Sequence, residues 1–426
     1  MKEKTKENQK AITLIALIIT IIILLILAGI SISALTQTGL FGKAKQAKKI
    51  TEQKTSEENA KLYEYEQLIA NQGQGKIFTN VDTNKTNPEA AMPTGATIIE
   101  GDATKGIVIK DSKDNEWVWV KVPKTEVFKT ATKADEYNKI KADLIEYAID
   151  YREGSAGQAR YWTDEWYDGC GIVAANGKTG AEIYTEMYNK MLSSVYTNGG
   201  FWITRYEIGD ATATSNNYEV RTIDSGTSGT AVSKADQVPY NWVTCSEAQG
   251  LASGMSTDTN KTSSLLFGIQ WDLVCKFLQE KGGLTVEQIK GGDDVGSTNW
   301  GNYQNSSLTL YRGKYNIDPS NSTSIWTSFD VNTDNYVTNS QTSSNTSYYQ
   351  SLTTGASEQT NKMNIYDFAG NEYEWTLEHA TSHASRPFAA RGGSYLNYGS
   401  NIPASNRGDF STTNSSYRIG FRSALY

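Results

Sequence analysis

Three blocks near the end of the chain carry the most information about its fold: NIYDFAGNEYEW at residues 364–375, ARGGSY at residues 390–395 and RIGFRSA at residues 418–424. Each block places glycine beside aromatic and charged side chains within a few residues. Trp375 and Phe421 are large apolar residues in strand-forming surroundings, so we expect both in the core. The blocks therefore predict a packed frame near the end of the chain.

The same blocks carry two arginines that need acidic partners. We expect Arg391 and Arg422 inside the frame, where an unpaired charge is costly, and Glu374 or Asp367 can supply the carboxylates. The glycines of these blocks permit close backbone approach or a positive φ. They are Gly370, Gly392, Gly393 and Gly420.

In this order and spacing, the three blocks resemble the domain of formylglycine-generating enzymes, a C-type-lectin-like fold that many non-enzymatic binding proteins share. Enzymes of that family bind copper through two cysteines that follow the arginine-glycine-glycine-serine block. Here those places hold LNY at residues 396–398 and NIP at residues 401–403, and no cysteine lies beyond Cys275. Because amide and apolar side chains cannot replace thiolates on Cu(I), we expect no copper and no enzyme, with a formylglycine-generating-type oxidase as the alternative.

The composition limits the class of protein and of partner. Of the 426 residues, 38 % are hydrophobic, which is enough for a packed core. The formal net charge of -7 argues against nucleic acid as a partner, because phosphate binding requires a basic surface. Tyrosine and glycine are frequent and proline is scarce. This mixture is typical of an exported, loop-rich protein.

The N-terminus predicts a membrane helix. Residues 11–35, AITLIALIITIIILLILAGISISAL, carry no charge. As a helix with a rise of about 1.5 Å per residue, they exceed the roughly 30 Å hydrocarbon core of a bilayer. Four lysines precede this segment and favour a cytoplasmic N-terminus, although four more follow between residues 43 and 49. A charged stretch with a sparse apolar stripe continues to about residue 72 and predicts a helical stalk.

The basic leader and the helix opened by AITLIA resemble the N-terminus of type IV pilins. This resemblance implies cleavage by a prepilin peptidase between Ala11 and Ile12, packing with other pilin subunits, and passage from the cell membrane to an extracellular pilus at the cell surface. Ala11 stands where glycine is usual, and Ala16 where glutamate is usual. A plain single-pass anchor and a signal peptide cut near Ser33 remain alternatives.

We therefore expect an α+β chain in which a long transmembrane and stalk α-helix precedes a loop-rich C-type-lectin-like domain of the formylglycine-generating-enzyme type. The predicted parts are a leader at 1–11, a pilin-like helix at 12–72, a linker at 73–97 and the domain at 98–426. Within the domain, TCSE at residues 244–247 is a capping box that starts a helix. The predicted strands are 106–109, 116–122 and 200–207; the predicted helices are 135–151, 181–196, 245–253 and one with Trp271, Val274, Cys275 and Leu278 on one face. Residues 292–360 are expected to form long ordered loops.

Few residues are suited to nucleophilic or zinc chemistry. Only three cysteines occur, and neither Cys170, in a predicted turn, nor Cys275, on an apolar helix face, has a neighbour that would activate it. His379 and His383 are expected in an exposed loop. Asn371 stands where the family has a calcium site, so the resemblance implies a structural Ca²⁺ there.

Residues 395–418 are rich in Asn, Ser and Tyr, which combine hydrogen bonding with rigid contact area as antibody contact surfaces do. The layout resembles the variable region of proteins diversified by diversity-generating retroelements. We expect a ligand-contact face made of Tyr395, Asn397, Tyr398, Ser400, Asn401, Asn406, Asp409, Phe410, Asn414 and Tyr417. The predicted function is a surface-displayed, minor or tip pilin-like adhesion protein that binds an extracellular protein or glycan; a structural pilus subunit is a further alternative.

Overall fold

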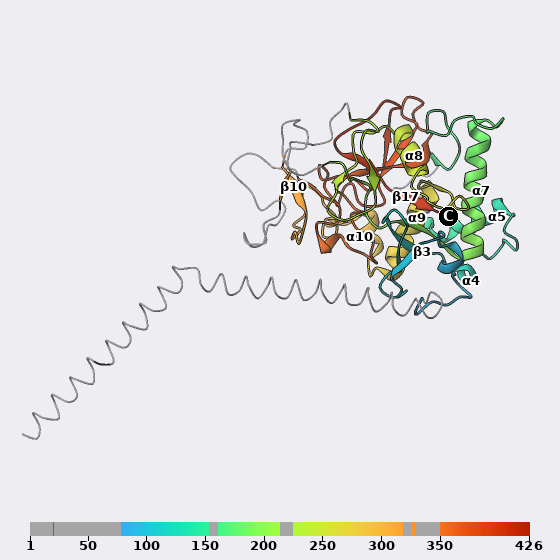
Figure 1. Cartoon of the computed structure of the whole chain (residues 1–426), viewed down its shortest axis with the longest axis horizontal. Helices are drawn as coiled ribbons and strands as arrows, with labels where there is room; N and C mark the ends of the chain where they lie inside the picture. The colour runs from blue at the N-terminus through green and yellow to red at the C-terminus, as the bar shows by residue number, and fades with distance from the viewer. Residues whose placement is uncertain (1–19, 21–77, 153–160, 214–224, 318–325, 329–349) are drawn as a thin grey trace, which may run out of the picture. The chain divides into compact units, whose positions relative to one another are not determined.

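The computed structural model describes residue 20 and residues 78–152, 161–213, 225–317, 326–328 and 350–426 (Figure 1). The chain divides into two compact units, residues 1–73 and 74–426. The predicted leader, the processing residues Ala11 and Ile12 and the spanning segment lie outside the described residues, apart from Thr20. Among the described helices, none has both the length and the apolarity needed to cross a bilayer.

A six-stranded antiparallel sheet runs through the domain and joins distant parts of the chain. Its strand order is β1 (Thr97–Glu100), β2 (Val108–Lys110), β3 (Glu116–Lys121), β5 (Gly200–Thr204), β17 (Ser423–Leu425) and β9 (Ser263–Leu265). The predicted strands at 106–109 and 116–122 form β2 and β3 of a hairpin, with Val108 opposite Val118. Its turn is held by Asp111, whose carboxylate accepts hydrogen bonds from the Asn115 backbone at 2.9 Å and the Trp117 indole at 2.9 Å.

A second sheet contains the blocks that the sequence singled out. Its strand order is β15 (Arg407–Phe410), β14 (Phe388–Arg391), β13 (Tyr373–Ala380) and β16 (Ile419–Phe421), and β4 (Trp162–Thr163) also pairs with β13. The chain passes from β16 to β17, and hence between the sheets, at Arg422. The Arg422 guanidinium donates to Glu374 at 2.9 Å and to the Thr204 carbonyl at 2.9 Å. The predicted pairing of Arg422 with Glu374 is confirmed.

Helices cover the sheets and fill the space between them. The longer ones are α5 (Tyr137–Tyr147), α7 (Gly180–Asn198), α8 (Cys245–Ser253) and α9 (Gly268–Lys281). α7 packs against β5 and α5. Figure 1 shows α5 and α7 together at one edge of the domain. α9 contacts both β3 and β13, and nearly all of its residues up to Leu278 are buried. The capping box of Thr244 and Glu247 starts α8, as predicted.

The remaining helices and strands of the described residues are short. They are α3 (Pro88–Ala91), α4 (Lys124–Val127), α6 (Ile149–Arg152), α10 (Val286–Lys290), the 3₁₀ helix η3 (Glu358–Thr360), and the strands β6 (Gly209–Asp210), β7 (Ala231–Val232), β8 (Val238–Pro239), β10 (Lys314–Asn316), β11 (Thr327–Ser328) and β12 (Ser351–Leu352). The stretch expected to form long loops therefore contains a small sheet of order β11-β10-β12.

The predicted linker at residues 73–97 is wrong where the structure describes it. Residues 78–97 contribute α3 and the start of β1, and Ala91 and Ala96 are buried in the core. The Thr86 hydroxyl donates to the Gly199 carbonyl at 2.8 Å. Prolines and polar residues suggested a linker, but tertiary packing with α7 and β5 orders this segment.

A buried charge cluster ties five elements together. Asp272 of α9 and Glu378 of β13 are both fully buried, and each accepts hydrogen bonds from Arg152 of α6, Arg391 of β14 and Arg407 of β15. Although burial by itself raises the pKa of Asp272, the three arginines bring it below its ordinary value. Arg391 therefore pairs with Asp272 and Glu378 and not, as the sequence suggested, with Glu374 or Asp367.

Replacing Asp272 with Asn is expected to lower the free energy of unfolding by about 3–5 kcal/mol, because it leaves buried arginines underpaired. Guanidinium denaturation of the full-length chain measures this loss. The control is Glu186→Gln, which removes an exposed ion pair with Lys178 and is expected to leave the midpoint nearly unchanged. Equal effects of the two substitutions would contradict the role assigned to the cluster.

Candidate ligand-contact face

The loop that follows β14 has a backbone fixed by another part of the chain. The Ser297 amide donates to the Gly399 carbonyl at 3.0 Å, and the Gln304 amide donates to the Asn397 carbonyl at 2.8 Å. At Gly393, φ is 75° and an added Cβ would lie 2.7 Å from the Ile402 carbonyl oxygen, so only glycine fits. These backbone contacts hold the loop in one conformation, and they do not involve its outward side chains.

We define the amide patch as three side chains of this loop, Tyr398, Ser400 and Asn401, together with Asn305 from an earlier part of the chain. Tyr398 is 49 % exposed, and Asn401 and Asn305 are exposed beside it in the structure. The Asn305 carboxamide accepts from the Gly399 amide at 3.1 Å and donates to the Thr298 hydroxyl at 3.2 Å. The sequence missed Asn305 because it lies far from the C-terminal frame in the chain.

We define a second group, the aromatic patch, as Trp242, Phe410, Asn414 and Tyr417. Phe410 ends β15 and the next two follow it in the chain, whereas Trp242 precedes α8. The rings of Trp242 and Tyr417 lie 5.7 Å apart. Trp242 has a φ of 56°, which is rare for a bulky residue, and its indole nitrogen is buried without a partner among the described residues. Strained backbone and unsatisfied donors are features that gather at functional sites. Trp242 is not among the predicted contact residues, because nothing in its immediate sequence marks it.

Three predicted contact residues belong to the frame. Tyr395 is 1 % exposed, so its assignment to the contact face is wrong. Its hydroxyl lies 3.5 Å from the Tyr417 carbonyl, so it links the segments that carry the two patches. Asn397 uses its side-chain oxygen to accept from the Ser394 amide at 2.9 Å, and the Asn406 carbonyl accepts from Arg391 at 3.1 Å.

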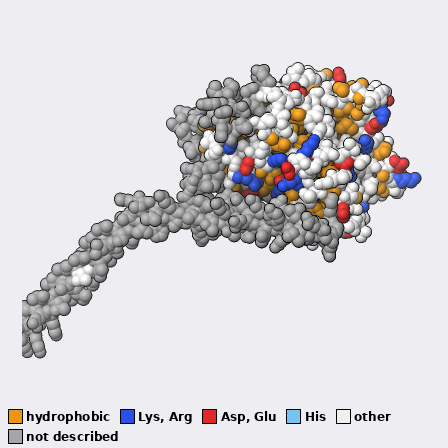
Figure 2. Space-filling view, viewed as in Figure 1, with side chains coloured by type: hydrophobic (Ala, Val, Ile, Leu, Met, Phe, Trp, Pro, Cys, Tyr) orange, Lys and Arg blue, Asp and Glu red, His pale blue; other side chains and the backbone are white. Residues whose placement is uncertain are grey.

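Phe410 and Asp409 lie between frame and surface. The Phe410 ring packs 5.4 Å from Trp375 and 5.6 Å from Tyr373, and it is only half-buried. Removal of Phe410 is therefore expected to disturb the core as well as the surface. Asp409 is half-buried in β15, with Arg386 at 3.9 Å. Figure 2 shows a surface in which uncharged polar side chains and backbone predominate, with small groups of paired charges.

The surroundings of Asn371 do not fit a calcium ion bound through its side chain. Its oxygen accepts hydrogen bonds from the Asn302 carboxamide at 2.9 Å and the Leu352 amide at 3.0 Å. Its nitrogen donates to Glu207 at 2.8 Å and to the Leu352 carbonyl at 3.1 Å. Among the described residues, no group of three or more His, Cys, Asp or Glu side chains is arranged to hold a metal ion. The Asn371 amide therefore serves as a buried crosslink.

The potential nucleophiles are buried. Cys170, Cys245 and Cys275 are free thiols in the interior, and burial raises the pKa of each. The prediction of a loop for His379 is wrong, because this residue lies in β13 with its ring stacked 4.7 Å from that of Tyr167. Burial lowers the pKa of His379, whereas His383 is exposed in a turn.

Comparison with known proteins agrees with the frame described above. The model of the sulfatase-modifying factor enzyme 1-like domain matches residues 173–425, more than half of the chain. The chain belongs to this family. The resemblance drawn from the three sequence blocks is confirmed, and with it a C-type-lectin-like domain of mixed helix and sheet. The pilin-like N-terminus stays a prediction.

Two solved structures are similar to parts of this family member. The structure titled "Crystal Structure of CarF" has 14 % identity and a TM-score of 0.31, with 53 % of this chain and 85 % of that chain covered. Treponema denticola variable protein 1 has 15 % identity and a TM-score of 0.29, with 53 % of this chain and 84 % of that chain covered. No curated protein matches the sequence significantly.

Glu207, the buried acid that accepts a hydrogen bond from Asn371, should make the stability of the domain depend on pH. Burial, followed by the charges of Asp367, Glu374 and Glu372, raises the pKa of Glu207 well above its ordinary value. Stability that depends on the protonated carboxyl is present below the unfolded pKa of about 4.3 and is lost as pH rises through the raised folded pKa. We expect Glu207→Gln, which cannot ionise, to gain Tm relative to the natural chain between pH 5 and pH 9.

Thermal unfolding of both proteins at the two pH values measures this difference. Glu287→Gln, at an exposed position of α10, is the matched control and should show no relative gain. A constant Tm difference between Glu207→Gln and the natural chain would show that Glu207 is ionised in the folded protein throughout this range.

Proposed function

We propose that this chain is a surface-displayed binding protein whose amide and aromatic patches contact an extracellular protein or glycan. The observation that carries the proposal is the separation of roles in residues 396–417. The backbone is held by hydrogen bonds to residues 289–305 and by the frame, whereas Tyr398 and Asn401 project outward. A fixed backbone lowers the entropy lost when such side chains bind a ligand.

The chemistry of the two patches supports recognition of a polar partner. Tyrosine gives a large amphipathic contact at low conformational cost, and asparagine gives both donors and acceptors. In the aromatic patch, the rings of Trp242 and Tyr417 lie 5.7 Å apart and offer two adjacent aromatic groups. The net charge of -7 disfavours nucleic acid as that partner.

We propose that the domain acts in binding and not in catalysis. The oxidase of the family requires thiolates after the arginine-glycine-glycine-serine block, and Tyr398 and Asn401 occupy that region. The three thiols of the chain lie elsewhere, in the interior, with pKa values raised by burial. Copper-dependent oxidation of a peptide thiol by the purified full-length chain would contradict this proposal.

The proposed location rests on the N-terminal sequence. The uncharged segment at residues 11–35 and its basic leader support membrane insertion, with cleavage between Ala11 and Ile12 and later display as a minor or tip pilin. Replacement of Ala11 with a bulky residue should then block processing by the prepilin peptidase. A mature N-terminus found at Ser33 instead would support a secretory signal.

Substitution of Tyr398 and Asn401 with Ala is expected to weaken adhesion at least tenfold while leaving Tm nearly unchanged, because both side chains are exposed. Adhesion of the full-length protein, displayed on cells, to a panel of host-cell proteins and glycans measures the first effect. Thermal unfolding measures the second.

Tyr311→Ala is the matched control, because Tyr311 is 46 % exposed and lies outside both patches. Phe410 is unsuitable for this test since it packs on Trp375. Equal adhesion of the natural chain and the double variant would contradict the assignment of the amide patch.

Diversification of this region by a retroelement is a further part of the proposal. Sequences of the same gene from sister isolates provide the test. We expect changes to concentrate at the outward positions of residues 396–417 and to spare the frame residues Tyr395 and Arg391. Changes spread evenly over the domain would contradict it.

A further inference from the structure

A cavity of about 230 Å³ lies where the ends of β3 and α9 meet, and it shares no residue with the amide patch or the aromatic patch. Its inner wall includes Trp119, Ile107 and Phe277, all of which are buried. The volume is below the roughly 300–1,000 Å³ of pockets for drug-sized ligands and well above the roughly 30 Å³ share of one water molecule. It therefore suits a ligand with a single ring.

Two lysines at this cavity lack a carboxylate partner. Neither Lys121 at the end of β3 nor Lys281 at the end of α9 forms an ion pair with any residue that the structure describes. The nearby Glu280 is already engaged, because it accepts from the Tyr147 hydroxyl at 2.7 Å and lies 3.7 Å from Lys276. The cavity thus presents two ammonium groups that form no ion pair with a described carboxylate.

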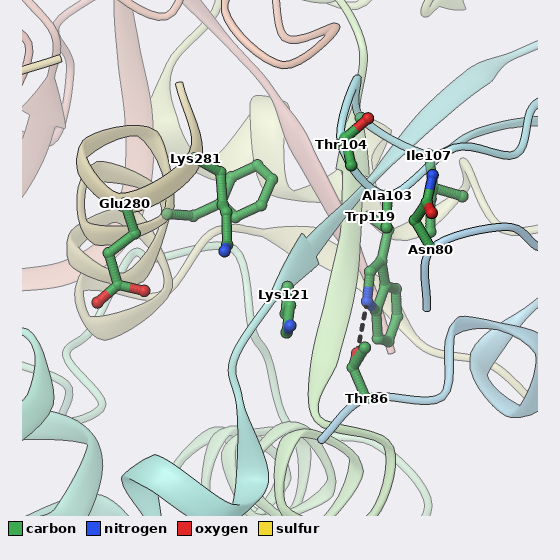
Figure 3. Close-up of a pocket in the computed structure, with 11 residues that line it drawn as sticks. Asn80, Thr86, Ala103, Thr104, Ile107, Trp119, Lys121, Glu280 and Lys281 are labelled. Atoms are coloured by element: carbon green, nitrogen blue, oxygen red, sulfur yellow. Dashed lines mark hydrogen bonds between the residues drawn. The ribbon is translucent and has the colours of Figure 1, made fainter. Parts of the chain in front are cut away.

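Lys121 lies near several charged groups. Burial, followed by the charges of Lys281 and Lys85, lowers the pKa of Lys121, and the charges of Glu126 and Asp82 act in the opposite direction. Lys85 has a partner in Glu126. Figure 3 shows Lys121 and Lys281 between the end of α9 and the wall formed by Trp119 and Thr86. An anion bound beside both lysines would relieve their repulsion.

The wall opposite the lysines combines an apolar ring with hydrogen-bonding groups. The Trp119 indole donates to the Thr86 hydroxyl at 2.8 Å and packs edge-on 5.0 Å from Trp202, so its orientation is fixed. At the mouth, the Asn80 nitrogen donates to Asp102 at 2.8 Å, which directs the amide oxygen to another donor. An apolar ring near an amide oxygen suits the two kinds of surface on a sugar ring.

We propose that this cavity binds an acidic monosaccharide of the hexuronate kind. The carboxylate lies between the ammonium groups of Lys121 and Lys281, the ring packs on Trp119 and Phe277, and hydroxyls donate to Asn80. This site is separate from the amide and aromatic patches. Its ligand is a small molecule, whereas the ligand of the patches is a macromolecule.

Isothermal titration of the full-length chain with sodium glucuronate, glucose and sodium benzoate tests the proposal. We expect glucuronate to bind, glucose to bind at least tenfold more weakly for lack of the carboxylate, and benzoate to bind more weakly than glucuronate. Lys121→Gln and Lys281→Gln should each weaken glucuronate binding about tenfold, since each removes a charge-assisted hydrogen bond.

Lys190→Gln, at an exposed position of α7, is the matched control and should bind glucuronate as the natural chain does. Thermal unfolding of all three variants confirms that they are folded. The proposal is overturned by absence of glucuronate binding at millimolar concentration, by equal binding of glucose, by tighter binding of benzoate, or by unchanged affinity in both cavity variants.

Discussion

The pairing of two buried carboxylates with three arginines is the constraint on which the rest of the domain depends. Asp272 and Glu378 are completely buried, and transfer of an unpaired carboxylate to such a site costs several kcal/mol. Arg152, Arg391 and Arg407 each contact both acids, so α6, α9, β13, β14 and β15 must meet at one point. A chain that failed to bring these elements together would leave charges without partners.

This constraint fixes the segment between β14 and β15 without using its exposed side chains. Arg391 and Arg407 hold the two ends of the segment between β14 and β15, and Arg391 also binds the Ser405 and Asn406 carbonyls. The outward side chains, such as Tyr398, contribute no contact to the cluster. The charge cluster and the exposed surface of this short region therefore depend on different residues.

The domain buries acidic groups in two different ways. Asp272 lies among arginines, which bring its pKa below the ordinary value, so it stays charged. Glu207 and Glu372 have amide and hydroxyl partners instead, and burial raises the pKa of both. The first arrangement joins elements through charge, whereas the second favours a neutral carboxyl beside the Asn371 crosslink. Lys121 and Lys281 differ from both arrangements, because they line a cavity and form no ion pair with any described residue.

Sequence patterns were enough to predict the family, the main helices, the strands of the β2–β3 hairpin and the Arg422–Glu374 pair, because these follow from local patterns and from blocks close together in the chain. The folded chain was needed to show that Asp272 pairs with Arg391, that Tyr395 is buried, that Trp242 and Asn305 join the two patches, and that residues 78–97 pack on the core. Local sequence limits backbone geometry and polarity, but burial and partners depend on which distant segments the fold places around a residue.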